Sequence, residues 1–142
     1  MNTLMQGKKL VPVDFSDHSL AAVDVALGMS KDPSSVHVVH ILHEPQPTHP
    51  DAFWVTIDRA KRRDHALIEL RSRLSDPRYA AVSLHVEFGD PGFRIAELAE
   101  QLEVGLIVLP SHGRTGIKRL LIGSVAERVV RCAHCPVLVL RE

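Results

Sequence analysis

The feature of this sequence that most constrains its fold is a regular alternation of strand-like and helix-like segments along the whole chain. Five short apolar runs indicate strands, over residues 9–13, 36–42, 82–88, 106–109 and 136–140. Segments with helical spacing separate them, over residues 20–29, 54–74, 91–102 and 124–132. This alternation is typical of parallel sheets, because each crossover between parallel strands needs a connecting helix. The sequence therefore predicts an α/β fold: a doubly wound five-stranded parallel sheet with helices on both faces.

Local signals mark where two of these helices begin. Ser16 is suited to cap the first helix, because its hydroxyl can accept a hydrogen bond from an amide of the first turn. Asp90 followed by Pro91 is a stronger signal, since proline at the first helical position loses no helix hydrogen bond. The apolar residues expected to face the core are Phe93, Ala96, Ala99 and Leu102 in this helix and Ile57, Ala60, Leu67, Leu70 and Leu74 in the longer one.

The length and charge of the chain indicate one globular domain without a preference for nucleic acid. Its 142 residues match the usual size of a domain, so we expect a single domain over residues 1–142. Seventeen Lys and Arg residues balance seventeen Asp and Glu residues, which leaves no net field to attract nucleic acid or an anionic membrane. The basic stretch 59–63 has acidic neighbours, and Glu69 and Arg73 have the spacing of a helical ion pair. We expect this helix face to be solvated.

The N-terminal sequence and the overall hydropathy indicate a cytoplasmic protein with no membrane partner. The first ten residues lack the apolar stretch and cleavage site of a signal peptide. No apolar run approaches the roughly 18 residues that span a bilayer.

Cys132 and Cys135 form a C-x-x-C pair, a pattern found in redox and zinc sites. Here the pair follows a helix and precedes a strand, so no helix N-terminus lowers a thiol pKa. No second pair of cysteines or histidines has the spacing that would complete a zinc site. We expect two partly buried thiols.

The expected ligand site lies where the two halves of the sheet meet. In open parallel sheets, ligands bind beyond the C-terminal ends of the strands, where the winding direction reverses. If the first strand is central, this point brings residues 12–14 close to residues 110–116. The second segment carries glycines and leads to a helix start at Gly123 and Ser124, a combination suited to binding an anion. Positive charge for phosphates can come from Arg114, Lys118 and Arg119.

These segments resemble the universal stress protein family. The likeness covers nearly the whole chain and is carried by residues 11–16, 89–91, 111–116, 123–129 and 135–139. The resemblance implies the adenine nucleotide alpha-hydrolase-like fold with strand order 3-2-1-4-5, usually in a homodimer. The P-loop pattern G-x-x-x-x-G-K-S/T and the dinucleotide pattern G-x-G-x-x-G are both absent from the expected positions.

ATP-binding members of this family share the pattern Gly-x-x-Gly, nine residues, then Gly-Ser or Gly-Thr. In this chain Gly113, the nine residues 114–122, Gly123 and Ser124 match, whereas Pro110 stands at the first glycine position. The resemblance implies a site for ATP with magnesium, or for ADP or AMP, with Asp14 near the ribose or the nucleotide-bound magnesium. It also implies contacts of the adenine with Pro12, Val13, Ile41 and Leu109, and of the phosphates and ribose with Gly113, Gly123, Ser124 and Val125. Arg114 is the cationic residue expected beside the phosphates.

Pro110 is the departure from the motif that bears most on function. Proline has no N–H, so any hydrogen bond that the glycine amide donates to a phosphate is lost. Such a loss costs about 1.5–3 kcal/mol, or roughly ten- to a hundredfold in affinity. We therefore expect nucleotide binding that is weakened rather than abolished.

Two classes of function follow from these features. No Ser/His/Asp set, carboxylate pair or metal cluster is evident, so the first is a nucleotide-binding regulatory module of the stress response with at most slow ATP hydrolysis. The second is a dimeric interaction protein whose crevice is vestigial because of Pro110. Strand Val137–Leu140 is apolar on both faces and lies at the sheet edge in the expected order. Such an edge is covered either by a second copy of the chain or by a helix.

Overall fold

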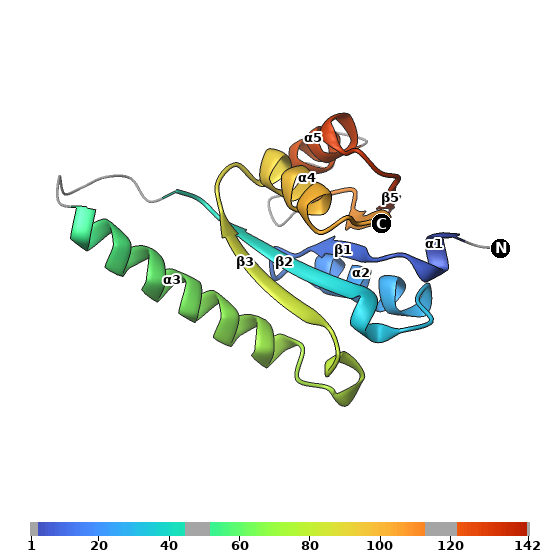
Figure 1. Cartoon of the computed structure of the whole chain (residues 1–142), viewed down its shortest axis with the longest axis horizontal. Helices are drawn as coiled ribbons and strands as arrows, with labels where there is room; N and C mark the ends of the chain where they lie inside the picture. The colour runs from blue at the N-terminus through green and yellow to red at the C-terminus, as the bar shows by residue number, and fades with distance from the viewer. Residues whose placement is uncertain (1–2, 45–51, 113–121, 142) are drawn as a thin grey trace.

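The chain forms one five-stranded parallel sheet in the order β3-β2-β1-β4-β5, which confirms the predicted fold class and strand order (Figure 1). The computed structural model describes residues 3–44, 52–112 and 122–141. The strands are β1 (Lys9–Pro12), β2 (Val36–Leu42), β3 (Ser83–Phe88), β4 (Leu106–Pro110) and β5 (Val137–Leu140). β1 lies at the centre of the sheet beside β4, and both strands are buried. Their residues are apolar, as is usual for strands buried on both faces, except for the buried Lys9.

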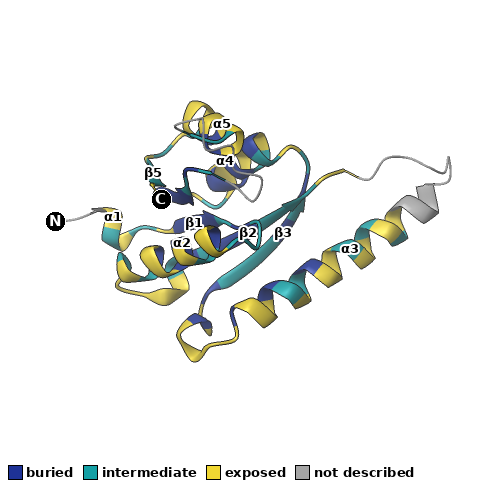
Figure 2. Ribbon diagram, turned by 180° about the vertical axis from the view of Figure 1, so that it is seen from behind, coloured by how far each residue is buried: buried dark blue, intermediate teal, exposed yellow. Residues whose placement is uncertain are grey.

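The helices divide between the two faces of the sheet (Figure 2). They are α1 (Thr3–Gln6), α2 (Asp17–Gly28), α3 (Ala52–Arg73), α4 (Pro91–Gln101) and α5 (Ser124–Cys132), with short turns η1 (Pro33–Ser35) and η2 (Pro77–Tyr79). One core cluster joins α2 and α3 to the sheet, and a second joins α4 and α5 to its other face. The two clusters receive alternate residues of β1, Val11 in the first and Leu10 in the second, because successive strand side chains point to opposite faces.

Two of the residues predicted to face the core are exposed instead. Phe93 is 56 % exposed on α4, and Ala60 lies exposed on α3. The buried stripe of α4 is centred on Ile95, Leu98 and Ala99, and Phe93 lies about 200° around the helix from Ile95. The stripe of α3 runs through Ala66, Leu70 and Leu74, with Ala60 about 240° from Ala66. Apolar residues occupy more than one face of α3 and of α4. For Phe93 and Ala60, the prediction therefore assigned the wrong face to the core.

Asp90 begins α4 as predicted and also joins α4 to α5. Its carboxylate accepts a hydrogen bond of 3.2 Å from the amide of Phe93, and Pro91 is the first helical residue. Nη1 of Arg128 on α5 donates to both carboxylate oxygens, at 2.9 and 3.1 Å. Burial raises the pKa of Asp90, but the hydrogen bonds from Phe93 and Arg128 outweigh it and hold the pKa below its ordinary value. The ionised carboxylate therefore stabilises this helix pair.

Asp90→Asn should make stability less dependent on pH. A carboxyl whose folded-state pKa is lowered stabilises above its unfolded pKa, and that contribution disappears as the pH falls through the folded value. Because both side chains are nearly half exposed, solvent screening keeps the contribution at about 0.5–1 kcal/mol. Asparagine still caps the helix, so the loss reports the charge. Urea unfolding should show a larger difference between wild type and variant at pH 7 than at pH 3, because the contribution decreases as the carboxylate protonates; the same difference at both values would contradict the assignment.

Candidate functional site

The site arises because β1 and β4 separate towards their C-terminal ends. The two strands pair only at Lys9 with Leu106 and Leu10 with Ile107. Beyond these pairs, β1 remains joined to β2 as far as Pro12, and β4 remains joined to β5 as far as Pro110. The chain continues from β1 into α2 on one face and from β4 towards α5 on the other, which leaves an opening between the strand ends.

A cavity of about 450 Å³ occupies this opening, a volume within the range of about 300–1,000 Å³ usual for small-molecule sites. It is the switch-point crevice that the sequence predicted. The predicted site residues that the structure describes all line it: Pro12, Val13, Asp14, Ile41, Leu109, Gly123, Ser124 and Val125. Gly113 and Arg114 lie outside the described residues, as do Lys118 and Arg119.

One wall of the cavity is formed by apolar side chains, and we call it the apolar slot. Val39 and Ile41 of β2, Leu109 of β4 and Ile95 of α4 line it and belong to the core cluster under α4 and α5. Val39, Leu109 and Ile95 are almost completely buried, so this wall is held by core packing rather than by a loop. A flat, apolar ligand group such as a heterocyclic base fits such a surface.

The N-terminus of α5 also lines the cavity, through Gly123, Ser124 and Val125. Gly123 is the N-cap residue of α5. Because glycine has no side chain, it makes no side-chain cap hydrogen bond to the amides of the first turn. The Gly123 amide donates to the carbonyl of Ser111, and the Ser111 amide donates to the carbonyl of Leu140 at 2.8 Å, so the helix start is tied to the end of β4. Amides of a first helical turn and the helix dipole together favour an anion at this position.

Pro110 is placed where a missing amide breaks no strand pairing. Ile107 and Ser111 donate their amides to Pro136 and Leu140, on the β5 side of β4. Since amides alternate in direction along a strand, the nitrogen of Pro110 faces the other side, where β1 has already diverged. A glycine at this position would direct its N–H into the cavity. The tertiary structure thus explains both why proline is tolerated and what it removes.

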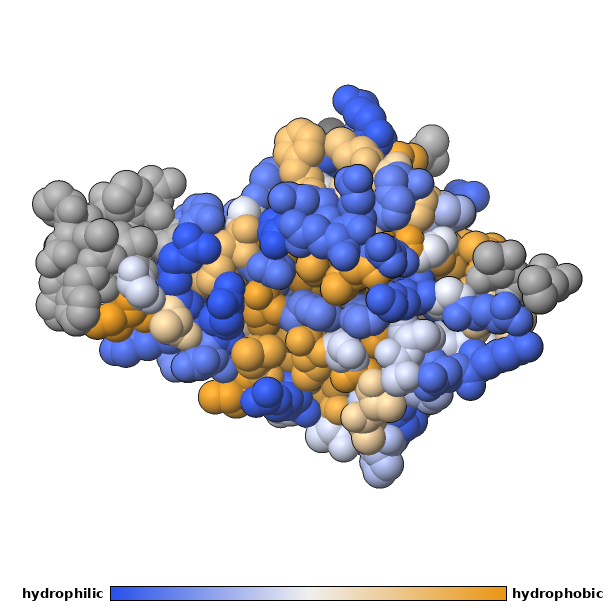
Figure 3. Space-filling view, in the orientation of Figure 1, coloured by the Kyte–Doolittle hydropathy of each residue, from blue (hydrophilic) through white to orange (hydrophobic). Residues whose placement is uncertain are grey.

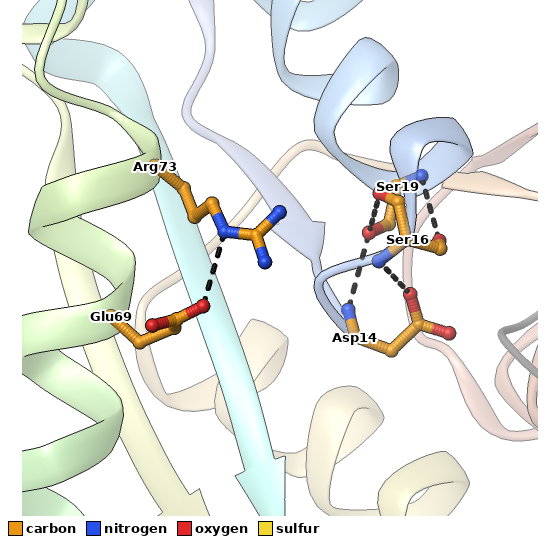
Figure 4. Close-up of polar contacts among 5 residues, drawn as sticks. All are labelled: Asp14, Ser16, Ser19, Glu69 and Arg73. Atoms are coloured by element: carbon orange, nitrogen blue, oxygen red, sulfur yellow. Dashed lines mark hydrogen bonds and ion pairs between the residues drawn. The ribbon is translucent and has the colours of Figure 1, made fainter.

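Asp14 lies at the cavity and also shapes the turn that begins α2 (Figure 4). The Ser16 amide donates to Oδ1 of Asp14 at 3.0 Å, and the Asp14 amide donates to Oγ of Ser19 at 3.2 Å. Ser16 caps the helix as predicted, accepting from the Ser19 amide at 3.2 Å. Phe15, between them, has a φ of 66°, a left-handed conformation rare for a bulky residue. These contacts fix the position of the carboxylate at the rim of the cavity.

Four polar residues that line the cavity were not predicted from the sequence: Ser19, His40, His43 and Arg62. Nδ1 of His40 lies 2.8 Å from the carbonyl oxygen of Val13, which can only accept, so Nδ1 carries the proton. Arg62 donates from Nη1 to the carbonyl of His43 at 3.0 Å. An isolated histidine in a strand carries no sequence signal for such a role.

The basic stretch of α3 is solvated at Lys61 and Arg63, as predicted, whereas Arg59 and Arg62 are half-buried. The guanidinium carbons of Arg59, Arg62 and Arg63 lie 4.5, 5.5 and 5.5 Å from the centroid of the Phe88 ring. Their spacing of three and four residues places them on one side of the helix, a signal that was available in the sequence. Farther along α3 the predicted pair Glu69–Arg73 is formed at 3.1 Å (Figure 4). The arginines bring positive charge to the end of β3 and, through Arg62, to the cavity.

The other chemistry considered from the sequence lies away from the cavity. Cys132 is exposed and Cys135 half-buried at the opposite end of α5, and burial raises the pKa of Cys135, which disfavours the reactive thiolate. Over residues 3–44, 52–112 and 122–141, no group of three or more His, Cys, Asp or Glu side chains is arranged to hold a metal ion. Among the helices of these same residues, none has the length and apolar character needed to cross a membrane.

Comparison with known proteins relates the whole chain to one family. The model of the universal stress protein family matches residues 5–141. Universal stress protein MJ0531 of Methanocaldococcus jannaschii is 34% identical over 95% of this chain and 82% of its own length. Universal stress protein YxiE of Bacillus subtilis is 28% identical over 96% of this chain and 100% of its own.

Solved structures have the same fold. Universal stress protein UspA from Lactobacillus plantarum has a TM-score of 0.75 at 26% identity, covering 95% of this chain and 97% of its own. The hypothetical protein MJ0577 has a TM-score of 0.77 at 25% identity and covers 97% of both chains. A universal stress protein in complex with cAMP has a TM-score of 0.65 at 24% identity, covering 96% of this chain and 97% of its own.

Proposed function

Because the chain belongs to the universal stress protein family, we propose that the cavity at the ends of β1 and β4 binds an adenine nucleotide and that the bound nucleotide regulates what the protein contacts. The observation that carries this proposal is the pairing of the apolar slot with the uncapped N-terminus of α5 in one cavity. A base fits the first and a phosphate fits the second.

The residues of the cavity divide between the parts of such a ligand. Val13, Ile41 and Leu109 are suited to pack against adenine, and Gly123 and Ser124 to bind phosphate through amides and the serine hydroxyl. The Asp14 carboxylate lines the cavity and is suited to bind the ribose or nucleotide-bound magnesium. Arg62 adds positive charge at the β2 side of the cavity. ATP, ADP and AMP all satisfy this arrangement, and the role is that of a regulatory module rather than a dedicated catalyst.

Calorimetric titration with Mg-ATP tests the proposal, with Pro110→Gly as the informative variant. We expect micromolar binding by the wild type and roughly ten- to a hundredfold tighter binding by the variant, because glycine restores an amide directed into the cavity. Pro77→Gly is the matched control: Pro77 is exposed in η2, outside the cavity lining, and its replacement should leave affinity unchanged. AMP and cAMP, the latter bound by a solved relative, serve as competing ligands.

The second candidate function is a dimeric interaction protein with a vestigial crevice, and Pro110 is the observation that favours it. β5 lies at the sheet edge with all four residues only partly buried, which suits pairing of Val137–Leu140 with the same strand of a second copy. Both candidate functions include this homodimer, so its presence does not distinguish them. Binding of Mg-ATP by the wild type supports the regulatory module. No heat from either the wild type or Pro110→Gly overturns it and leaves the interaction protein.

Two further expectations are part of the proposal. We propose that residues 1–142 act as one domain, since both core clusters draw on strands from the two halves of the sheet. We also propose that this module acts in the cytoplasm, where adenine nucleotides are abundant. The balanced charge of the chain supports a partner other than nucleic acid.

A further inference from the structure

Two histidines on neighbouring strands form a close pair that is not part of the cavity lining. His37 is the second residue of β2 and His85 the third of β3. In the parallel register His37 faces Ser83 and Val39 faces His85, so the two histidines are diagonal neighbours. Nδ1 of His37 lies 2.9 Å from Nε2 of His85, and the ring centroids are 5.2 Å apart. The cavity begins at Val39 and extends beyond the strand ends.

The pair lies on a part of the sheet that remains reachable from solvent. Val36 and Val38 point into the cluster under α2 and α3, whereas Val39 and Ile41 belong to the cluster under α4 and α5. By strand alternation His37 is on the second face, together with His85. Both histidines are partly buried there, and Figure 2 shows the intermediate exposure of β2 and β3. Figure 3 shows hydrophilic and hydrophobic residues mixed on the face of the molecule seen in the view of Figure 1.

The surroundings of the two imidazoles disfavour their positively charged form. Burial lowers the pKa of His37, as do the nearby His85 and Lys8, and burial likewise lowers the pKa of His85 against the opposing effect of Glu87. The hydrogen bond between the rings places a proton on one of the two facing nitrogens. When both nitrogens coordinate one ion, that ring carries its proton on its other nitrogen, as a neutral imidazole can. Glu87 itself is held by Arg94 of α4 at 3.3 Å.

We propose that His37 and His85 chelate a divalent transition-metal ion, with copper(II) preferred. Two imidazole nitrogens bound at about 2.0–2.1 Å with a right angle at the metal, as in tetragonal copper(II) or nickel(II) sites, lie about 2.9 Å apart. That is the separation between Nδ1 of His37 and Nε2 of His85. In tetrahedral zinc the corresponding separation is about 3.3 Å, so zinc requires the rings to move apart. The metal replaces the hydrogen bond between the rings.

The protein supplies two ligands to this site and water supplies the others, so the metal affinity is limited by the two histidines. Two protein ligands give a weak, exchangeable site rather than a structural one, and copper leads the affinity order for nitrogen ligands. A bound ion joins β2 to β3 and binds only the folded sheet, so it should stabilise the protein by mass action. The site responds to metal independently of the nucleotide cavity.

Titration with copper(II) and with nickel(II), which does not oxidise thiols, tests the proposal on the whole chain. We expect one equivalent of copper(II) bound with micromolar affinity, nitrogen hyperfine structure in the electron paramagnetic resonance spectrum, and a rise of several degrees in melting temperature. His37→Gln and His85→Gln should each weaken binding at least tenfold. Glutamine retains a hydrogen-bonding side chain, and circular dichroism checks that both variants fold.

The matched control removes potential ligands elsewhere. Cys132 and His134 are exposed, and the double variant Cys132→Ser/His134→Gln should bind copper(II) as the wild type does. Binding that survives in both His37→Gln and His85→Gln, or that is lost in the control, overturns the site. So does a wild type that shows no binding of either metal below about 100 μM, an affinity weaker than about −5.5 kcal/mol.

Discussion

Truncation of Leu70 to alanine is expected to lower the free energy of unfolding by about 2–5 kcal/mol, among the largest effects of any single substitution in this chain. Leu70 is fully buried and is the centre of the stripe through which α3 packs on the sheet, with Ala66 and Leu74 one turn to either side. Alanine removes the buried methyl groups and leaves a cavity that a long, regular helix cannot collapse to fill.

Ile68→Ala is the matched control on the same helix. Ile68 is 62% exposed, so its truncation should change the free energy of unfolding by less than about 0.5 kcal/mol. Urea unfolding monitored by circular dichroism measures both variants. Equal effects of the two truncations would show that α3 is not anchored through the stripe at Leu70.

Leu70→Ala should also affect ligand binding in the cavity. Arg62 lies on α3 two turns before Leu70, and its contact with the His43 carbonyl depends on the position of the helix. Loosening of α3 therefore moves a positively charged residue of the cavity lining. We expect Leu70→Ala to weaken Mg-ATP binding, whereas Ile68→Ala leaves it unchanged.

Gly92→Ala is expected to destabilise the protein by about 1–3 kcal/mol, although alanine is the better helix former. Gly92 lies in the first turn of α4 against α5, and a Cβ built there meets Cβ, Cγ and Cδ of Arg128 at 2.6 Å. Cβ of Arg128 is fixed by the backbone of α5 and cannot swing away. The two helices must therefore move apart, and with them Pro91 and Ala126 of the cavity lining.

Two variants separate this clash from an effect of glycine itself. At Gly28 a Cβ meets nothing within 4 Å, so Gly28→Ala should be neutral or slightly stabilising. Adding Arg128→Gly to Gly92→Ala removes the opposing Cβ and should recover part of the loss despite the lost contact with Asp90. A double variant whose losses simply add would locate the effect of Gly92 elsewhere. Thermal unfolding followed by circular dichroism measures each of these variants.

The elements that the sequence predicts correctly are specified by local patterns. The segment 106–109 is apolar without interruption, and the segment 36–42 is rich in β-branched residues. Asp90-Pro91 and Ser16 mark helix starts by chemistry that acts within one turn. Short-range signals of this kind survive into the folded protein because nothing distant competes with them. The helix faces of Phe93 and Ala60 were wrong for the complementary reason: which side of a helix is buried depends on what it meets.

The sequence by itself determined the order and type of the elements and, through the reversal of winding after β1 and β4, which chain segments line the cavity. It could do so because parallel crossovers and strand alternation leave few ways to arrange these elements. Only the tertiary structure decided that the Pro110 nitrogen faces the cavity, that Arg62 reaches it, and that His37 meets His85. These contacts join residues far apart in the chain, and their geometry is set by strand register and helix packing, which no local pattern encodes.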